Sequence, residues 1–198
     1  MKYLIVLLFI AVAANAQTVK PKSKASRAPT VIAAPLQPFS IKGLTLGMDR
    51  NAAEDVITTL PGVHRKNEVL YYSRESGWDN VFPSGLDTLV GVPVQSVALH
   101  FFDNKLDSVY IKISETRRAT DIAEAFTEKF GKPTVATAEV KNILGYVGKQ
   151  YIWTWEQKDA SLTIISPSDK IDETSITLSS SASKQRFLDK KNKDKKDL

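Results

Sequence analysis

Two short segments of the chain carry apolar residues at helical spacing. Between Asp49 and the Pro61-Gly62 pair, apolar side chains recur at i, i+1, i+4, i+5 and i+8. Residues 120–130 form a second apolar face, which ends at a glycine followed by a proline two positions later. Each predicted helix is short and apolar on one side only, so each needs a sheet to cover its apolar face.

Alternation of apolar and polar residues predicts strands that come mainly in hairpins. The predicted strands are 41–46, 68–72, 97–102, 108–113, 150–156, 161–166 and 175–178. Hairpins imply an antiparallel sheet, and the two helices would lie together on one of its faces. The element order is roughly βαβββαβββ, with two similar helix-plus-hairpin halves. The chain is therefore predicted to have an α+β fold.

The two ends of the chain differ from this body. Residues 1–16 have the charged start, the apolar stretch and the Ala14-Asn15-Ala16 site of a secretory signal peptide, so cleavage is expected near Ala16. We expect residues 17–38 to form a disordered Pro/Lys-rich linker, 39–183 a single α+β domain, and 184–198 a disordered basic tail. The expected location is the periplasm or the extracellular space, with no transmembrane segment in the mature chain.

Charge separates the body from its flanks. Residues 39–183 contain 15 Lys and Arg against 19 Asp and Glu. By contrast, residues 17–38 carry four basic residues and no acid, and residues 184–198 carry seven basic residues and three acids. We interpret these arms as segments that keep the protein soluble and act as spacers. The alternative is that they bind a polyanion through weak, salt-sensitive contacts. Because the acidic body repels phosphate, we expect no specific nucleic-acid binding.

Residue types that carry catalytic chemistry are sparse. The chain has no cysteine, which excludes disulfides, thiolate zinc sites and thiol nucleophiles. His64 and His100 have no second histidine at i+2 or i+4, so we predict no metal site and no cofactor. The acid pair Asp172-Glu173 is typical of solvated charges. No catalytic residue is predicted, although groups that meet only in space leave a hydrolase acting on an envelope polymer as an alternative.

Aromatic side chains are the main candidates for binding. Tyr151, Trp153 and Trp155 alternate along one predicted strand, so they share a face. We favour this face as the floor beneath a helix; an exposed surface for a partner is the alternative. Trp78 and Phe82 lie in a polar, glycine-containing loop, where they suit a partner contact and a cap on the core equally well. These five residues are the predicted binding residues.

Two motifs resemble those of a known envelope family. Residues 43–48 (GLTLGM) lead into residues 53–56 (AEDV), and residues 130–133 (FGKP) precede the strand that contains Trp153. Both pieces resemble small bacterial envelope modules of the SmpA/OmlA outer-membrane assembly lipoprotein type, although this chain lacks the lipid-bearing cysteine of that family. The resemblance implies a style of fold and an envelope location, and it implies no functional residues.

These features together predict a non-enzymatic module that is secreted or periplasmic. We expect it to act as a binding or accessory protein of the bacterial cell envelope, with a protein or peptide as its unidentified partner. The two alternatives are a hydrolase acting on an envelope polymer and a polyanion-binding protein that acts through its basic arms.

Overall fold

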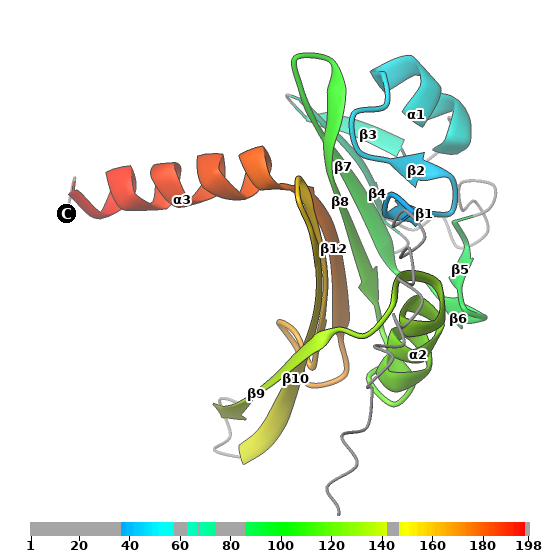
Figure 1. Ribbon diagram of the computed structural model, residues 1–198, viewed down its shortest axis with the longest axis vertical. Helices are drawn as coiled ribbons and strands as arrows, with labels where there is room; N and C mark the ends of the chain where they lie inside the picture. Colours follow the sequence, from blue (N-terminus) through cyan, green and yellow to red (C-terminus); the bar gives the residue numbers. More distant parts are fainter. Residues whose placement is uncertain (1–36, 58–62, 67, 74–85, 142–146, 197–198) are drawn as a thin grey trace, which may run out of the picture. The chain divides into compact units, whose positions relative to one another are not determined.

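The computed structural model describes residues 37–57, 63–66, 68–73, 86–141 and 147–196, all within one unit of the chain, Pro35–Leu198 (Figure 1). These residues form an α+β fold on one eight-stranded sheet, in the strand order β3-β4-β7-β8-β12-β11-β10-β9. Every pairing between neighbouring strands of this sheet is antiparallel. The predicted fold class is confirmed.

Three helices follow groups of two, six and four strands along the described residues. The main sheet contains β3 (Val63–Lys66), β4 (Val69–Ser73), β7 (Ser96–Phe102), β8 (Lys105–Ile113), β9 (Thr134–Lys141), β10 (Val147–Gln157), β11 (Ala160–Ser166) and β12 (Thr174–Ser180). Two small hairpins pair β1 (Ser40–Ile41) with β2 (Leu44–Thr45) and β5 (Thr88–Leu89) with β6 (Val92–Pro93). The helices are α1 (Arg50–Ile57), α2 (Ala119–Phe130) and α3 (Ser181–Lys196).

The strand register places alternate residues of β8, β11 and β12 on one buried face. Ile111 of β8 lies opposite Ile176 of β12, which lies opposite Ile164 of β11, and all three side chains are fully buried. Apolar residues at two-residue intervals continue this layer along the same strands. β12 pairs with β8 on one side and with β11 on the other. This last strand therefore joins two blocks of hairpins into one sheet.

Helices α1 and α2 cover this buried face. α1 contributes Ala53 and Ile57 to the hydrophobic core, and α2 contributes Ile122 and Phe126. Gly131 follows α2 with φ 86°, a left-handed conformation that glycine adopts without steric cost. Both helices lie on the same face, as the sequence predicts (Figure 1).

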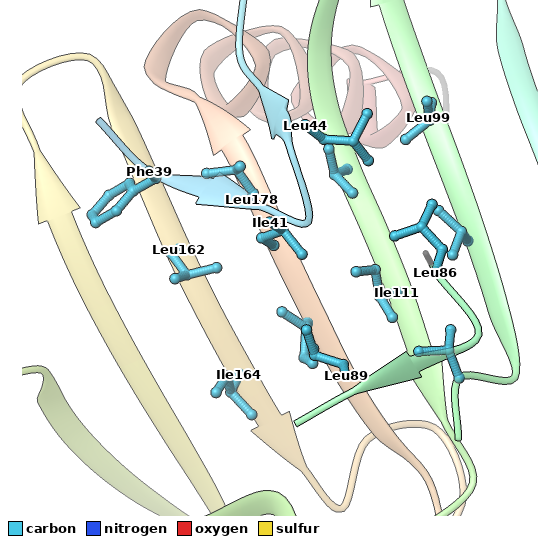
Figure 2. Close-up of a cluster of buried hydrophobic side chains, with 14 of the residues drawn as sticks. Phe39, Ile41, Leu44, Leu86, Leu89, Leu99, Ile111, Leu162, Ile164 and Leu178 are labelled. Carbon is cyan, nitrogen blue, oxygen red and sulfur yellow. The ribbon is translucent and has the colours of Figure 1, made fainter. Parts of the chain in front are cut away.

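The N-terminal hairpin completes the core. Figure 2 shows Phe39 and Ile41 lying over the strands that carry Leu162 and Leu178, and Leu44 over the neighbouring strand β8. These five side chains are between 0% and 4% exposed. Burial of this size is the main stabilising contribution in a domain without disulfides.

The structure also contains elements that the sequence pattern does not predict. Strands β3, β5, β6 and β9 occupy segments where no strand is expected. Helix α3 covers most of residues 184–198, where the sequence predicts a disordered tail. Contacts at the first turns of α3, described below, supply the order that composition alone does not indicate. In the part of the chain that the structure describes, no helix is long and apolar enough to cross a membrane.

Adjacent residues of β12 provide a test of the two faces. We expect Ile176→Ala to lower the free energy of unfolding by about 2 to 5 kcal/mol, because it removes a fully buried side chain and leaves a cavity. Thr177 points to the opposite face, so Thr177→Ala should cost less than about 1 kcal/mol. Urea unfolding followed by circular dichroism measures both. Equal losses would contradict the assignment of the buried face.

Candidate binding surface

Strand β9 forms one edge of the main sheet and is exposed on both faces. Seven of its eight residues are exposed. It pairs with β10 from Thr134 to Lys141, and within the described residues no strand pairs with its outer edge. Valine and threonine at four of its positions favour an extended strand. β9 therefore presents a row of backbone N–H and C=O groups that another strand can pair with.

The opposite edge of the sheet, β3, differs in length and charge. β3 has four residues, and its Arg65 and Lys66 are exposed. Arg65 also forms an ion pair with Glu54 of α1. On β9, by contrast, the first five residues are uncharged, and the charges Glu139 and Lys141 lie near its end. Short, charged edge strands resist pairing with other chains, so β9 is the more accessible edge.

Trp155 lies in the core, at the inner end of the predicted aromatic face. Its side chain is 3% exposed, and its ring meets Phe126 of α2 edge to face, with a centroid distance of 5.9 Å. The indole Nε1 donates a hydrogen bond of 2.7 Å to the carbonyl oxygen of Gly131. Trp155 is therefore part of the floor beneath a helix, the favoured prediction.

Tyr151 and Trp153 continue the same face of β10 beyond α2. Their rings stack with a centroid distance of 5.7 Å and an interplanar angle of 23°. Trp153 is partly buried against the core and lies opposite Val135 of β9, which is 53% exposed. Tyr151 is 42% exposed and lies opposite Thr137. We call Val135, Tyr151 and Trp153 the aromatic patch; it adjoins the free edge of β9.

The other two predicted binding residues, Trp78 and Phe82, lie outside the described residues. The aromatic patch therefore unites two of the five predicted residues with a strand that the sequence analysis missed. Nothing in the residue pattern of β9 indicates burial, because its side chains are exposed on both faces.

The second face of the sheet, here called the open face, carries hydroxyl groups. One row of directly opposed residues crosses seven strands: Tyr71, Ala98, Tyr110, Thr177, Thr163, Thr154 and Thr134. All of these residues are at least partly exposed. Helices α1 and α2 lie on the buried face, so neither of these helices covers this row.

An ion cluster ties the β11–β12 connection to the open face. Lys112 Nζ of β8 lies 2.7 Å from Glu173 Oε1 and 2.9 Å from Asp169 Oδ2. The hydrogen bonds that Lys112 donates to Glu173 and, to a smaller extent, to Asp169 raise the pKa of Lys112 well above its usual range. The prediction that Asp172-Glu173 is merely solvated is wrong for Glu173, which is 3% exposed. A lysine that stays protonated cannot serve as a general base, so this cluster acts as a structural clamp.

A cavity of about 420 Å³ lies next to the clamp. It is bounded by the ends of β9 and β10 and by the β11–β12 connection, with Val140, Gly148, Pro167 and Ile171 among its lining residues. Gln150 Nε2 donates a hydrogen bond of 2.7 Å to the Pro167 carbonyl oxygen. The described residues contain no group of three or more His, Cys, Asp or Glu side chains that could hold a metal ion.

The first turns of α3 are fixed by contacts around Asp107 of β8. Ser180 Oγ donates a hydrogen bond of 2.6 Å to Asp107 Oδ1 and accepts one of 2.9 Å from the Ser183 backbone N–H. Arg186 forms an ion pair with the Asp107 carboxylate. Its guanidinium also lies over the ring of Phe102, 3.9 Å from the centroid. These contacts explain why a helix begins where composition predicts disorder.

The charge of Asp107 is stabilised by the same contacts. Burial raises the pKa of Asp107, but hydrogen bonds from Arg186 and Ser180 outweigh it and hold the pKa below its usual value. His100 Nδ1 lies 3.8 Å from Asp107 Oδ2, too far for a hydrogen bond. A second, exposed ion pair joins Lys184 of α3 to Glu156 of β10 at 3.5 Å.

Comparison with protein-family models, with curated proteins and with solved structures finds no match for this chain. The resemblance to SmpA/OmlA modules stays a prediction that rests on residues 43–48, 53–56 and 130–133. The surfaces described above are therefore the basis for inferring a function.

The clamp predicts a large difference between two lysines. Lys112→Met should lower the free energy of unfolding by about 3 kcal/mol or more, because it leaves Glu173 buried without a counter-charge. Lys105→Met breaks an exposed pair with Asp49 and should cost less than about 1 kcal/mol. Denaturant unfolding measures both changes.

This loss should not depend on pH in the neutral range. The raised pKa of Lys112 makes its contribution fully present below the ordinary value of 10.5, and the contribution declines only as pH rises through the higher folded-state pKa. The Lys112→Met loss should therefore be equal at pH 6 and pH 8. A clear change between these two conditions would show that another group dominates the cluster.

The anchor of α3 predicts a local effect with the opposite pH dependence. Asp107→Asn should raise hydrogen exchange at the first two turns of α3 by about tenfold, because it removes the charged partner of Arg186. In the native chain, the lowered pKa keeps the anchor intact above the ordinary aspartate value of 3.8, and it weakens as pH falls through the folded-state pKa. Asp103→Asn, in the exposed β7–β8 turn, is the control. Equal protection of α3 in both variants would contradict this anchor.

Proposed function

We propose that this chain is a non-enzymatic binding module of the bacterial cell envelope that takes an extended segment of a protein or peptide along the outer edge of β9. The observation that carries the proposal is the length and exposure of this edge strand. Eight residues pair with β10 on one side, and within the described residues the other side has no strand partner. We propose a periplasmic or secreted location on the basis of residues 1–16.

Backbone pairing would supply the affinity of such a complex. A peptide that adds to a sheet edge forms main-chain hydrogen bonds with the strand, independently of its own sequence. A partner of about six to eight residues would match the length of β9. The contrast with the short, charged β3 edge favours β9 as the acceptor strand.

The aromatic patch would supply selectivity. Side chains of an added strand point alternately to the two faces of the sheet, so every second residue would lie on the side of Val135 and Trp153. The stacked rings of Tyr151 and Trp153 offer a rigid apolar surface at this position. We therefore expect bound segments to carry an apolar residue there, with small or polar residues at the alternate positions.

The test uses peptides selected from a random phage-displayed library on the chain from Gln17 to Leu198. We expect Tyr151→Ala to weaken binding of an enriched peptide by at least about fivefold in fluorescence anisotropy, because it removes an exposed ring beside β9. Tyr71→Ala is the matched control, since Tyr71 is 40% exposed on β4. It should change the affinity by less than about twofold.

Hydrogen exchange then locates the bound peptide. Binding should slow exchange at backbone amides of β9 and leave β3 unchanged. Three results would overturn the proposal: no enrichment of any peptide, protection confined to another element, or cleavage of the selected peptide by the purified chain. The last result would favour the hydrolase alternative.

A further inference from the structure

Helix α3 is held at its first turns and exposed beyond them. Its ion pairs to the sheet come from Lys184 and Arg186, and no described residue after Arg186 forms an ion pair or a hydrogen bond with the sheet. Phe187 is 68% exposed and Leu188 is 43% exposed. Figure 1 shows α3 leading away from the end of β12. A helix of 16 residues is thus presented to the surroundings on a fixed base.

The charge of α3 is opposite to that of the domain that carries it. Between Lys184 and Lys196 the chain has seven basic residues and two acidic ones, Asp189 and Asp194. Residues 39–183 carry 19 acidic and 15 basic residues. An anionic surface would therefore attract α3 and repel the body. Because of this difference in charge, the helix, and not the sheet, would approach such a surface.

The exposed Phe187 and Leu188 distinguish between kinds of anionic partner. A soluble polyanion would interact with the lysines alone. The interface of a bilayer also accepts aromatic and leucine side chains. Lysine stems beside these residues can lie along the apolar region while their ammonium groups stay at the level of the head groups. Neither apolar residue contributes to the core cluster. Their exposure is therefore better explained by a lipid surface than by a dissolved polymer.

We infer that α3 docks this protein onto membranes that contain anionic lipids, with Phe187 and Leu188 entering the interface and the lysines of α3, among them Lys190 and Lys193, supplying the attraction to the anionic head groups. The Arg186 to Asp107 anchor keeps the helix attached to the sheet while its outer turns lie on the lipid. This inference does not depend on the peptide-binding proposal, because it concerns a different element and a different class of partner.

Vesicle co-sedimentation of the chain from Gln17 to Leu198 tests the inference. This form omits residues 1–16, whose apolar stretch would itself enter lipid. Vesicles of phosphatidylethanolamine with phosphatidylglycerol should bind the chain at low salt, and vesicles of phosphatidylcholine should not. The double change Lys190→Gln with Lys193→Gln should lower the partition coefficient by about tenfold or more. The matched Lys-to-Arg pair should restore it, since arginine keeps the charge.

Two further variants separate α3 from the rest of the chain and lipid from other polyanions. Lys132→Gln with Lys158→Gln removes two exposed charges from the body and should leave partitioning within about twofold of the parent. Phe187→Ser should weaken vesicle binding several-fold without changing retention on immobilised polyphosphate. Circular dichroism confirms that each variant is folded as the parent is.

Three outcomes would overturn the inference. The first is no binding to anionic vesicles at low salt. The second is an equal loss from the body variant and the α3 variant, which would assign the attraction to overall charge. The third is polyphosphate binding that depends on Lys190 and Lys193 while Phe187→Ser leaves vesicle binding unchanged. That pattern would identify a soluble polyanion as the partner.

Discussion

The pairing of β12 with β8 is the contact on which the rest of the structure depends. It joins β3-β4-β7-β8 to β11-β10-β9, and without it the two blocks would each expose apolar residues along a free edge. The pair also aligns Ile111 with Ile176, so the same register that forms the hydrogen bonds completes the buried layer. Because β12 lies 61 residues after β8 ends, this contact closes a long loop. We expect the sheet to fold cooperatively only after β12 has paired with both β8 and β11.

The two faces of this sheet differ in composition and in what covers them. The buried face meets α1, α2 and the N-terminal hairpin, and its side chains form one hydrophobic core. The open face carries hydroxyl groups and the Lys112 clamp, and it needs no cover because its polar groups can bind water. The last residues of β12 continue directly into α3, which the Asp107 anchor holds at that end of the sheet. A helix with little apolar surface can persist there because its base is fixed by charge and capping.

The sequence predicts the buried half of this fold better than the exposed half. Periodicity identifies α1, α2 and the two long hairpins, because burial of one face imposes the pattern that periodicity detects. β9 was missed because both its faces are exposed, so threonine, alanine and valine follow one another without a buried set. α3 was missed because its helicity depends on Asp107, 79 residues before Arg186. The two-residue spacing along β10 correctly predicts that Tyr151 and Trp155 lie on the same face of the sheet. Their different burial follows from the position of α2, which no local pattern contains.

The two proposed surfaces use separate elements, and this separation affects what the protein can do. Lys184 contacts Glu156 near the end of β10. The free edge belongs to β9, which pairs with β10 on the side opposite β11. A lipid surface held by α3 would therefore leave the outer edge of β9 available for a peptide. The attraction proposed for α3 would be mainly electrostatic and would weaken with salt, whereas the strand pairing proposed at β9 would depend on short-range backbone contacts and would not. A module of this kind could hold an extended segment of an envelope protein close to a membrane, with location and recognition set by different physical interactions.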